Sequence, residues 1–285
     1  MMKYIIKLLM MSMLLTVVTI PLVKASEENA AATNFSVTPL NEKTLKPQSS
    51  YFDLKLSPGS NKKMTVRIDN PNDEAIKVLV EANNGSTNDN GITSYLTTKK
   101  RDTTLKVAFS DMTSFKKETI TVPKNATKNV VVPINVPQES FEGVVLGGLR
   151  FSLEDDDKKK AETSTVTSKI SYTIGVLLKE SDEAIEPKMK LNAVQVEQRN
   201  ARNYISANLQ NTVPRIIKKL EVNARVYKES GKKVLYEGNA TNLRMAPHSN
   251  FNYGINLDDQ PLIAGKYRME ITGKADGVPF SFKRN

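Results

Sequence analysis

Apolar and polar residues alternate with a period of two along most of this 285-residue chain. Successive side chains of a β-strand point to opposite faces, so this alternation predicts strands with one buried face. After the first 25 residues, no segment sustains the 3.6-residue period of an amphipathic helix. The alternation recurs at residues 64–68, 76–80, 130–136, 166–178, 205–209, 220–226, 251–255 and 267–271. Many short strands separated by turn residues predict an all-β fold built from β-sandwiches.

The two halves of the chain share an order of turn residues. An Asn that ends one strand pattern is followed six residues later by an Ile that begins the next, at Asn70 and again at Asn211. Each half then has a Pro at the entry of a strand and a Gly before a later strand. Tyr267 is similar to the Tyr of the tyrosine corner in immunoglobulin-like domains. We therefore predict two tandem immunoglobulin-like β-sandwich domains, although Asn, Pro and Gly also occupy turns of any β protein.

The first half is longer because of an irregular stretch at residues 82–114. A long loop on a rigid sandwich commonly carries binding residues, although it can also be a surface insertion without function. The candidate ligand-binding residues are Tyr95, which could stack on a sugar, and the cations Lys99, Lys100 and Arg101. Cations of this kind pair with carboxylates and phosphates. The alternative interpretation of the basic triplet is a solvated turn.

The first 25 residues have the pattern of a secretory signal peptide. Lys3 and Lys7 precede an apolar run, and Ala25 ends it before a polar segment. The alternative is an N-terminal membrane anchor. No later segment is apolar for 18 residues, so we expect no stable transmembrane span in the mature chain. A secreted chain without Cys is typical of exported Gram-positive proteins.

The rest of the composition argues against catalysis. The chain has no Cys and one His, His248, which leaves no metal site with thiolate or paired imidazole ligands. A cell-wall hydrolase would need a catalytic pair of carboxylates, and no sequence pattern identifies two acids that would form such a pair in the fold. The acids at 154–157 lack the spacing of a calcium loop. We therefore expect no enzyme activity, no metal and no cofactor.

The net charge of +10 favours anionic partners, among them nucleic acid and an anionic cell wall. Export and the absence of interleaved aromatic and basic residues disfavour nucleic acid. The predicted organisation is a signal peptide at 1–25, one domain at 34–153, a charged linker at 154–165 and a second domain at 166–285. Residues 280–285 look like the opening of a strand.

Several segments together resemble the WxL-interacting protein family. They are FSVTP at 35–39, YFDLKLSPG at 51–59, SFEGVVLGGL at 140–149, SYTIGVLL at 171–178, MAPHSNF at 245–251 and LIAGKY at 262–267. The resemblance covers about residues 34–285 and implies two immunoglobulin-like domains. The family usually continues through a last strand to a transmembrane helix and a short basic tail, and this chain shows none of them. Either the sequence is truncated, or the protein is released or held by wall binding alone. We therefore expect the second domain to lack its last strand and to present an open edge.

The resemblance also implies a function. It implies a protein at the cell surface or cell wall of a Gram-positive bacterium, with an N-terminal domain that binds peptidoglycan. It implies a C-terminal domain that engages WxL-domain surface proteins or host extracellular matrix proteins. The alternative is an exported assembly chaperone, which also uses two immunoglobulin-like domains and donates strand edges.

Overall fold

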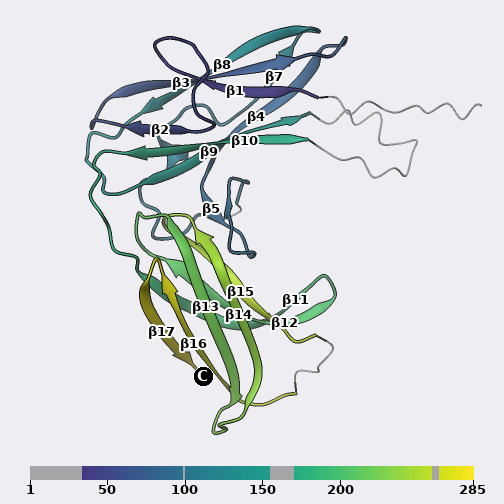
Figure 1. Cartoon of the computed structure of the whole chain (residues 1–285), viewed down its shortest axis with the longest axis vertical. Helices are drawn as coiled ribbons and strands as arrows, with labels where there is room; N and C mark the ends of the chain where they lie inside the picture. The colour runs from purple at the N-terminus through teal and green to yellow at the C-terminus, as the bar shows by residue number, and fades with distance from the viewer. Residues whose placement is uncertain (1–33, 99, 155–169, 259–262) are drawn as a thin grey trace, which may run out of the picture. The chain divides into compact units, whose positions relative to one another are not determined.

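The computed structural model describes residues 34–98, 100–154, 170–258 and 263–285 (Figure 1). The predicted signal peptide at 1–25 lies outside the described residues, and so does the predicted linker except for Glu154. Residues Asn34–Asn285 belong to one compact unit. Its fold is all-β, as the alternation predicts.

The first sandwich consists of a three-stranded and a five-stranded sheet. The smaller sheet has the order β1-β3-β8, with β1 at Ser36–Leu40, β3 at Asn61–Asn70 and β8 at Ala126–Asn135. The larger sheet has the order β2-β10-β9-β4-β7. Its strands are β2 (Phe52–Lys55), β10 (Ser171–Lys179), β9 (Val145–Leu153), β4 (Ile76–Asn84) and β7 (Lys117–Val122). All its neighbours are antiparallel except β2 and β10, which are parallel.

The second sandwich consists of a three-stranded and a four-stranded sheet. The order β11-β12-β15 joins β11 (Met189–Arg199), β12 (Arg202–Asn211) and β15 (Ser249–Asn256). The order β14-β13-β16-β17 joins β14 (Val234–Met245), β13 (Ile217–Lys228), β16 (Tyr267–Ala275) and β17 (Val278–Arg284). Every pairing in these two sheets is antiparallel.

Each sandwich has its own core, formed by the inward half of the alternating residues. Strands β4 and β15 show this directly, because their buried and less buried residues alternate. Val78 and Phe151 are fully buried in the first core, and Ile217 and Ile271 in the second. Burying one such side chain stabilises a fold by about 1.5–3 kcal/mol. The two cores explain why the period of two persists along the chain.

The two sandwiches repeat one strand order. The sheet β1-β3-β8 corresponds to β11-β12-β15, and the strands β10-β9-β4-β7 correspond to β17-β16-β13-β14. The Asn at the end of the strand makes equivalent hydrogen bonds to the following turn in both sandwiches. The Asn70 side-chain amide donates to the carbonyls of Glu74, Val122 and Pro123, at 2.9, 3.2 and 2.9 Å. This ties the turn after β3 to the strand entry at Pro123.

In the second sandwich, Asn211 repeats this arrangement. Its side-chain amide donates to the carbonyls of Arg215 and Ala246, at 2.7 and 2.9 Å. The Tyr267 hydroxyl donates back to the Ile263 carbonyl, as expected of a tyrosine corner. The turn residues that suggested a duplication therefore occupy equivalent structural positions.

The structure corrects the predicted division of the chain at one strand. Residues 171–179, predicted to lie in the second domain, form β10, which pairs with β9 and β2 of the first sandwich. In the sequence, the charged run at 154–165 therefore separates β9 from β10, which are neighbours in one sheet. The chain passes to the second sandwich later, between Lys179 and Met189. Alternation identifies the buried face of a strand but not its pairing partner, which is why the sequence misplaced β10.

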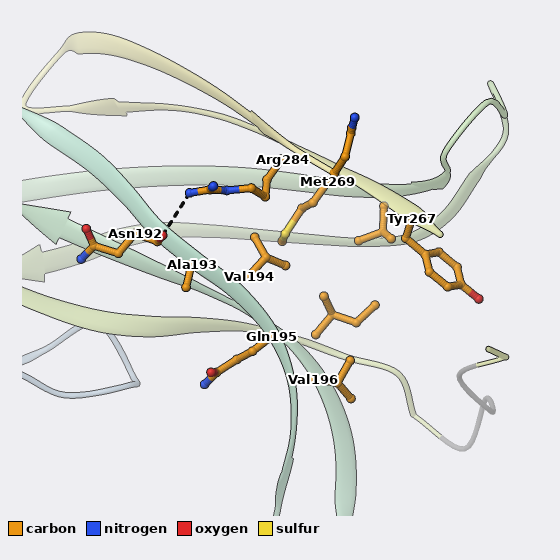
Figure 2. Close-up of a pocket in the computed structure, with 11 residues that line it drawn as sticks. Asn192, Ala193, Val194, Gln195, Val196, Tyr267, Met269 and Arg284 are labelled. Carbon is orange, nitrogen blue, oxygen red and sulfur yellow. Dashed lines mark hydrogen bonds between the residues drawn. The ribbon is translucent and has the colours of Figure 1, made fainter. Parts of the chain in front are cut away.

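The predicted strand opening at 280–285 belongs to β17, which pairs with β16 along its whole length. Because β17 takes the position of β10, the gap expected at this position is not seen. The second sandwich has no counterpart of β2 among its described strands. On that side a groove of about 360 Å³ opens between β11 and the strands β16 and β17 (Figure 2).

Candidate functional site

The irregular insertion lies between β4 and β7, and its counterpart between β13 and β14 is residues 229–233. Strand β4 continues to Asn84, so the irregular part begins later than predicted. The insertion holds a small hairpin of β5 (Ser86–Thr87) and β6 (Thr93–Ser94), followed by a 3₁₀ turn at Phe109–Asp111. Because the insertion departs from a strand order that the two sandwiches otherwise share, it is a candidate for a functional site.

Two adjacent glycines in β9 let the insertion approach both faces of the larger sheet. A Cβ atom on Gly147 would lie 2.2 Å from the ring of Phe109, which is fully buried in the core. A Cβ atom on Gly148 would lie 2.6 Å from the ring of Tyr95, on the other face. Only glycine permits these distances, so the Gly-Gly pair fixes both aromatic rings.

Tyr95 is half-buried against the outer face of the sheet. Its backbone carbonyl accepts a hydrogen bond from the Asn83 side chain at 3.0 Å, and its hydroxyl lies beside Gly175 of β10. Burial raises the pKa of the Tyr95 hydroxyl above its usual value. The hydroxyl therefore stays protonated at neutral pH and remains a hydrogen-bond donor.

Tyr95 lines a hollow of about 320 Å³ that residues of the second sandwich complete. Leu146 and Ile216 give the hollow apolar walls, and Lys218 and Arg244 are exposed at its rim. Neither the ammonium of Lys218 nor the guanidinium of Arg244 has an ion-pair partner within the part of the chain that the structure describes. The hollow thus combines a flat aromatic ring with two cations that are free to pair.

Of the predicted basic triplet, neither Lys100 nor Arg101 lines this hollow. Lys99 lies outside the described residues. Arg101 donates to the carbonyls of Leu105 and Lys106, both at 2.9 Å, and forms an ion pair with Asp111 at 2.7 Å. Because these contacts lie within the insertion, Arg101 stabilises the loop itself.

Lys100 and Arg101 instead line a separate small pocket of about 100 Å³, together with Asp102 and His248. Asp102 accepts hydrogen bonds from Thr104 and, across the pocket, from Gln210 at 2.8 Å and from Asn250. Burial acts to raise the pKa of Asp102, but these hydrogen bonds outweigh it and lower the pKa below its usual value. The carboxylate is therefore charged at neutral pH and joins the insertion to the second sandwich.

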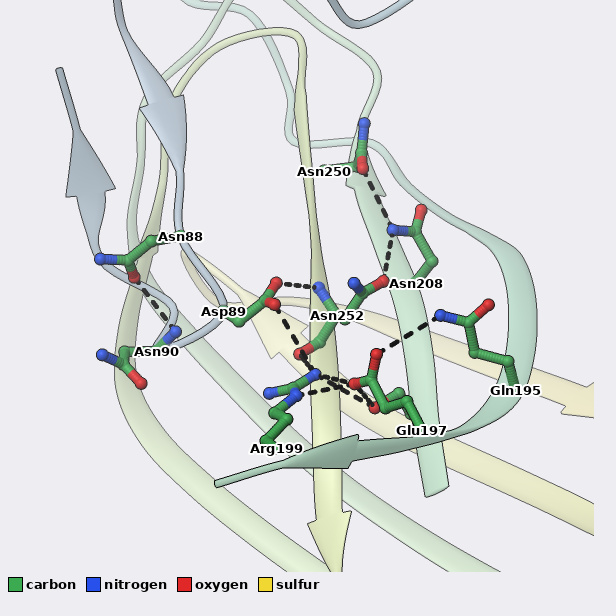
Figure 3. A network of polar contacts seen from close by, with 10 residues as sticks. Asn88, Asp89, Asn90, Gln195, Glu197, Arg199, Asn208, Asn250 and Asn252 are labelled. Carbon is green, nitrogen blue, oxygen red and sulfur yellow. Dashed lines mark hydrogen bonds and ion pairs between the residues drawn. The ribbon is translucent and has the colours of Figure 1, made fainter. Parts of the chain in front are cut away.

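The β5–β6 hairpin makes a second connection, through Asp89 (Figure 3). The Asp89 carboxylate accepts the backbone N–H of Asn252 at 2.8 Å and lies 3.8 Å from the Arg199 guanidinium. Arg199 in turn donates to the Asn252 carbonyl at 2.9 Å and to Glu197. These contacts connect the hairpin to β15 at Asn252 and, through Arg199, to β11.

Backbone and hydroxyl contacts reinforce this connection. The Thr87 and Ser249 hydroxyls lie 2.5 Å apart, and the Ala246 N–H donates to the Thr87 hydroxyl at 3.0 Å. The Arg244 N–H donates to the Gly91 carbonyl at 2.7 Å. The insertion therefore contacts both sandwiches, and its surroundings include residues from each.

Tyr95 is a candidate from the sequence, whereas Lys218 and Arg244, which line the same hollow, are not. These cations lie more than a hundred residues along the chain, and no local pattern links them to Tyr95. The Gly147-Gly148 pair was the available signal, because glycine inside a strand marks a close approach. Elsewhere in the described residues, no cluster of His, Cys, Asp or Glu could hold a metal ion. None of the described helices is long and apolar enough to cross a membrane.

Comparison with solved structures finds distant likenesses. A complex titled a chaperone–tip adhesin complex of CFA/I fimbriae biogenesis is 12% identical, with 88% of this chain and 98% of that chain covered and a TM-score of 0.36. The E. coli chaperone DraB is 13% identical, with coverages of 88% and 97% and a TM-score of 0.29. The CupB2 chaperone of Pseudomonas aeruginosa is 10% identical, with coverages of 83% and 97% and a TM-score of 0.28. These likenesses concern the fold alone.

Comparison with protein families is more specific. A search of curated proteins found no significant match. Residues 35–153 match the WxL Interacting Protein peptidoglycan binding domain, and residues 161–285 match the WxL Interacting Protein host binding domain. Both families are named for binding and not for catalysis, and their order is the predicted one. The chain belongs to the WxL Interacting Protein family.

Proposed function

We propose that this protein is a non-catalytic binding protein of the Gram-positive cell surface. Its first sandwich, with the insertion, attaches to peptidoglycan. Its second sandwich engages WxL-domain surface proteins or host extracellular proteins. The family names of the two matched segments support this division. Export through the predicted signal peptide at residues 1–25 is part of the same proposal.

The hollow around Tyr95 is the observation that carries the wall-binding half of the proposal. The Tyr95 ring packs against Gly148 and Gly175 of the sheet and offers an apolar surface to a sugar ring. Lys218 and Arg244 at the rim offer charge-assisted hydrogen bonds to carboxylates of the wall, each worth roughly 1.5–3 kcal/mol in good geometry. A ligand in this hollow would touch residues from both sandwiches.

The predicted cations keep a narrower role in the proposal. Lys100 is exposed beside the small polar pocket and is free to contact the wall, and Lys99 precedes it in the chain. Arg101 acts through the loop that it holds together.

The experiment is sedimentation of the mature chain, residues 26–285, with purified insoluble peptidoglycan. We expect the parent to sediment, and the Tyr95→Ala variant and the Lys218→Ala/Arg244→Ala double variant to bind about tenfold or more weakly. The double variant should also lose part of the salt dependence, because screening acts on the contacts that it removes.

The matched control is the Lys62→Ala/Lys190→Ala double variant. Both lysines are exposed on strands, and neither lines the hollow. A parent that stays in the supernatant at low salt would refute wall binding. Sedimentation of the Tyr95 and Lys218/Arg244 variants at the parent's level would leave wall binding intact and reject this hollow as its site.

A further inference from the structure

The first sandwich shows how an added strand covers one edge of its larger sheet. Strand β2 runs parallel to the end of β10, with Phe52 beside Val176 and Lys55 beside Lys179. Phe52 and Leu56 are only 2% and 4% exposed, so this short segment contributes to the core.

One polar residue between these apolar side chains also contributes. Asp53 lies next to Phe52 in β2, and its carboxylate is 3.4 Å from the Lys179 ammonium of β10. The segment therefore fills the edge with apolar side chains and meets a cation of the neighbouring strand with a carboxylate.

The corresponding edge of the second sandwich is open. Strand β17 takes the place of β10, and among the described strands it pairs with β16 alone. The groove beside it is lined by apolar side chains of both sheets, including Val194, Val196 and Met269 (Figure 2). Val196 on β11 is 56% exposed, which is unusual for a valine at the mouth of a core.

Few described contacts close this groove. The Arg284 guanidinium donates to the Asn192 carbonyl across it at 3.0 Å, where β11 has a register shift. An open edge strand beside exposed apolar side chains readily pairs with another chain. The side chain of the neighbouring Lys283 is 63% exposed, and its ammonium forms a long ion pair with the Glu270 carboxylate at 3.9 Å.

We propose that an extended segment of a partner protein adds to the free edge of β17, in the position that β2 takes beside β10. The segment carries apolar, acidic and apolar side chains in succession, as Phe52-Asp53-Leu54 does in the first sandwich. Its apolar side chains enter the groove at Val194, Val196 and Met269, and its carboxylate, on the opposite face of the added strand, meets Lys283. Backbone hydrogen bonds to a strand edge supply affinity, and side-chain pockets supply specificity. This inference rests on the proposed partner-binding role of the second sandwich.

The test uses the mature chain and a labelled synthetic peptide with the sequence of residues 50–57, SYFDLKLS. We expect saturable binding to the parent and at least tenfold weaker binding to the Val196→Asp variant, because a carboxylate would then lie in the apolar groove. The matched control is Val131→Asp, since Val131 is 47% exposed on edge strand β8 of the first sandwich. Substitution at either exposed site should leave the fold intact, which a melting curve checks.

A Lys283→Glu variant gives a second readout that does not alter the groove. This variant should bind the unmodified peptide more weakly than the parent protein does. It should regain binding with a peptide in which Asp is replaced by Lys. Hydrogen exchange should show protection of β17 amides when the parent peptide is bound. Absence of saturable binding, or binding unaffected by Val196→Asp, would overturn the proposal.

Three further outcomes separate this inference from the proposed function. Concentration-dependent dimers of the parent that Val196→Asp abolishes would show that a second copy occupies the edge, which also overturns the proposal. A purified WxL-domain protein that binds the parent and Val196→Asp equally would leave the proposed function standing and reject the groove. If the peptide binds the parent and a WxL-domain protein does not, the groove would stand as a binding site, and the WxL-domain protein would be rejected as the partner.

Discussion

His248 is the single histidine of the sequence, and the fold holds it in a left-handed backbone conformation with φ of 46°. Its N–H donates to the Val213 carbonyl at 3.2 Å. Its Nδ1 atom is buried without a hydrogen-bond partner among the described residues. Burial lowers the pKa of His248, and the nearby Asp102 charge and a hydrogen bond with the Thr212 backbone oppose this only in part.

This residue predicts a pH dependence of stability. The unfolded chain takes up a proton near pH 6.5, whereas the folded chain keeps His248 neutral to lower pH. The free energy of unfolding should therefore be constant above about pH 7 and fall as the pH drops below about 6.5. The lowered pKa of Asp102 acts in a separate window, below about pH 4. Urea titrations between pH 7.5 and 5 measure the slope.

The matched variant is His248→Asn, because Asn tolerates the left-handed region and does not titrate. We expect this variant to lose the slope between pH 6.5 and 5. An unchanged slope would show that another group takes up the proton.

Within strand β9, Gly147 contacts the core residue Phe109, whereas Gly148 contacts Tyr95 of the candidate site. Gly147→Ala should destabilise the fold by about 1–3 kcal/mol, because the new methyl group displaces Phe109 from the core. Gly148→Ala should instead displace Tyr95 on the outer face and weaken peptidoglycan binding, with a smaller loss of stability. Denaturant titration and wall sedimentation of both variants give the comparison.

Gly265→Ala is the control, since its Cβ would lie 3.7 Å from Tyr267, an ordinary contact distance. A Gly148→Ala variant that binds walls like the parent, with Tyr95 visibly displaced, would remove Tyr95 from the site.

Much of each element could be predicted from the sequence, because burial on one face imposes the period of two. The repeated Asn70 and Asn211 predicted a duplication, and both side chains cap equivalent turns. Pairing partners could not be predicted in the same way. Strand β10 presents an apolar face that suits either sandwich, and its hydrogen bonds to β9 and β2 arise only on folding. For the same reason the sequence names only one residue of the candidate hollow, Tyr95, because Lys218 and Arg244 reach it only in the folded chain.

At the scale of the whole molecule, the insertion links the sandwiches through two carboxylates. Asp102 accepts from Gln210 and Asn250, and Asp89 accepts from Asn252 and lies near Arg199. Hydrogen bonds to charged groups contribute about 1.5–3 kcal/mol each. Because each core is separate, we expect these contacts to couple the unfolding of the two sandwiches.

The Asp89→Ala/Asp102→Ala double variant tests this coupling. We expect the parent to unfold in one calorimetric transition and the double variant in two, because each core would then respond to heat alone. The control is Asp73→Ala/Asp111→Ala, which removes two carboxylates whose partners, Asn125 and Arg101, belong to the first sandwich and its insertion. The control should lower the melting temperature without splitting the transition. If the double variant also unfolds in one step, the remaining contacts, among them those of Thr87, Gly91 and Val144, suffice to couple the cores, and the carboxylates are not the link.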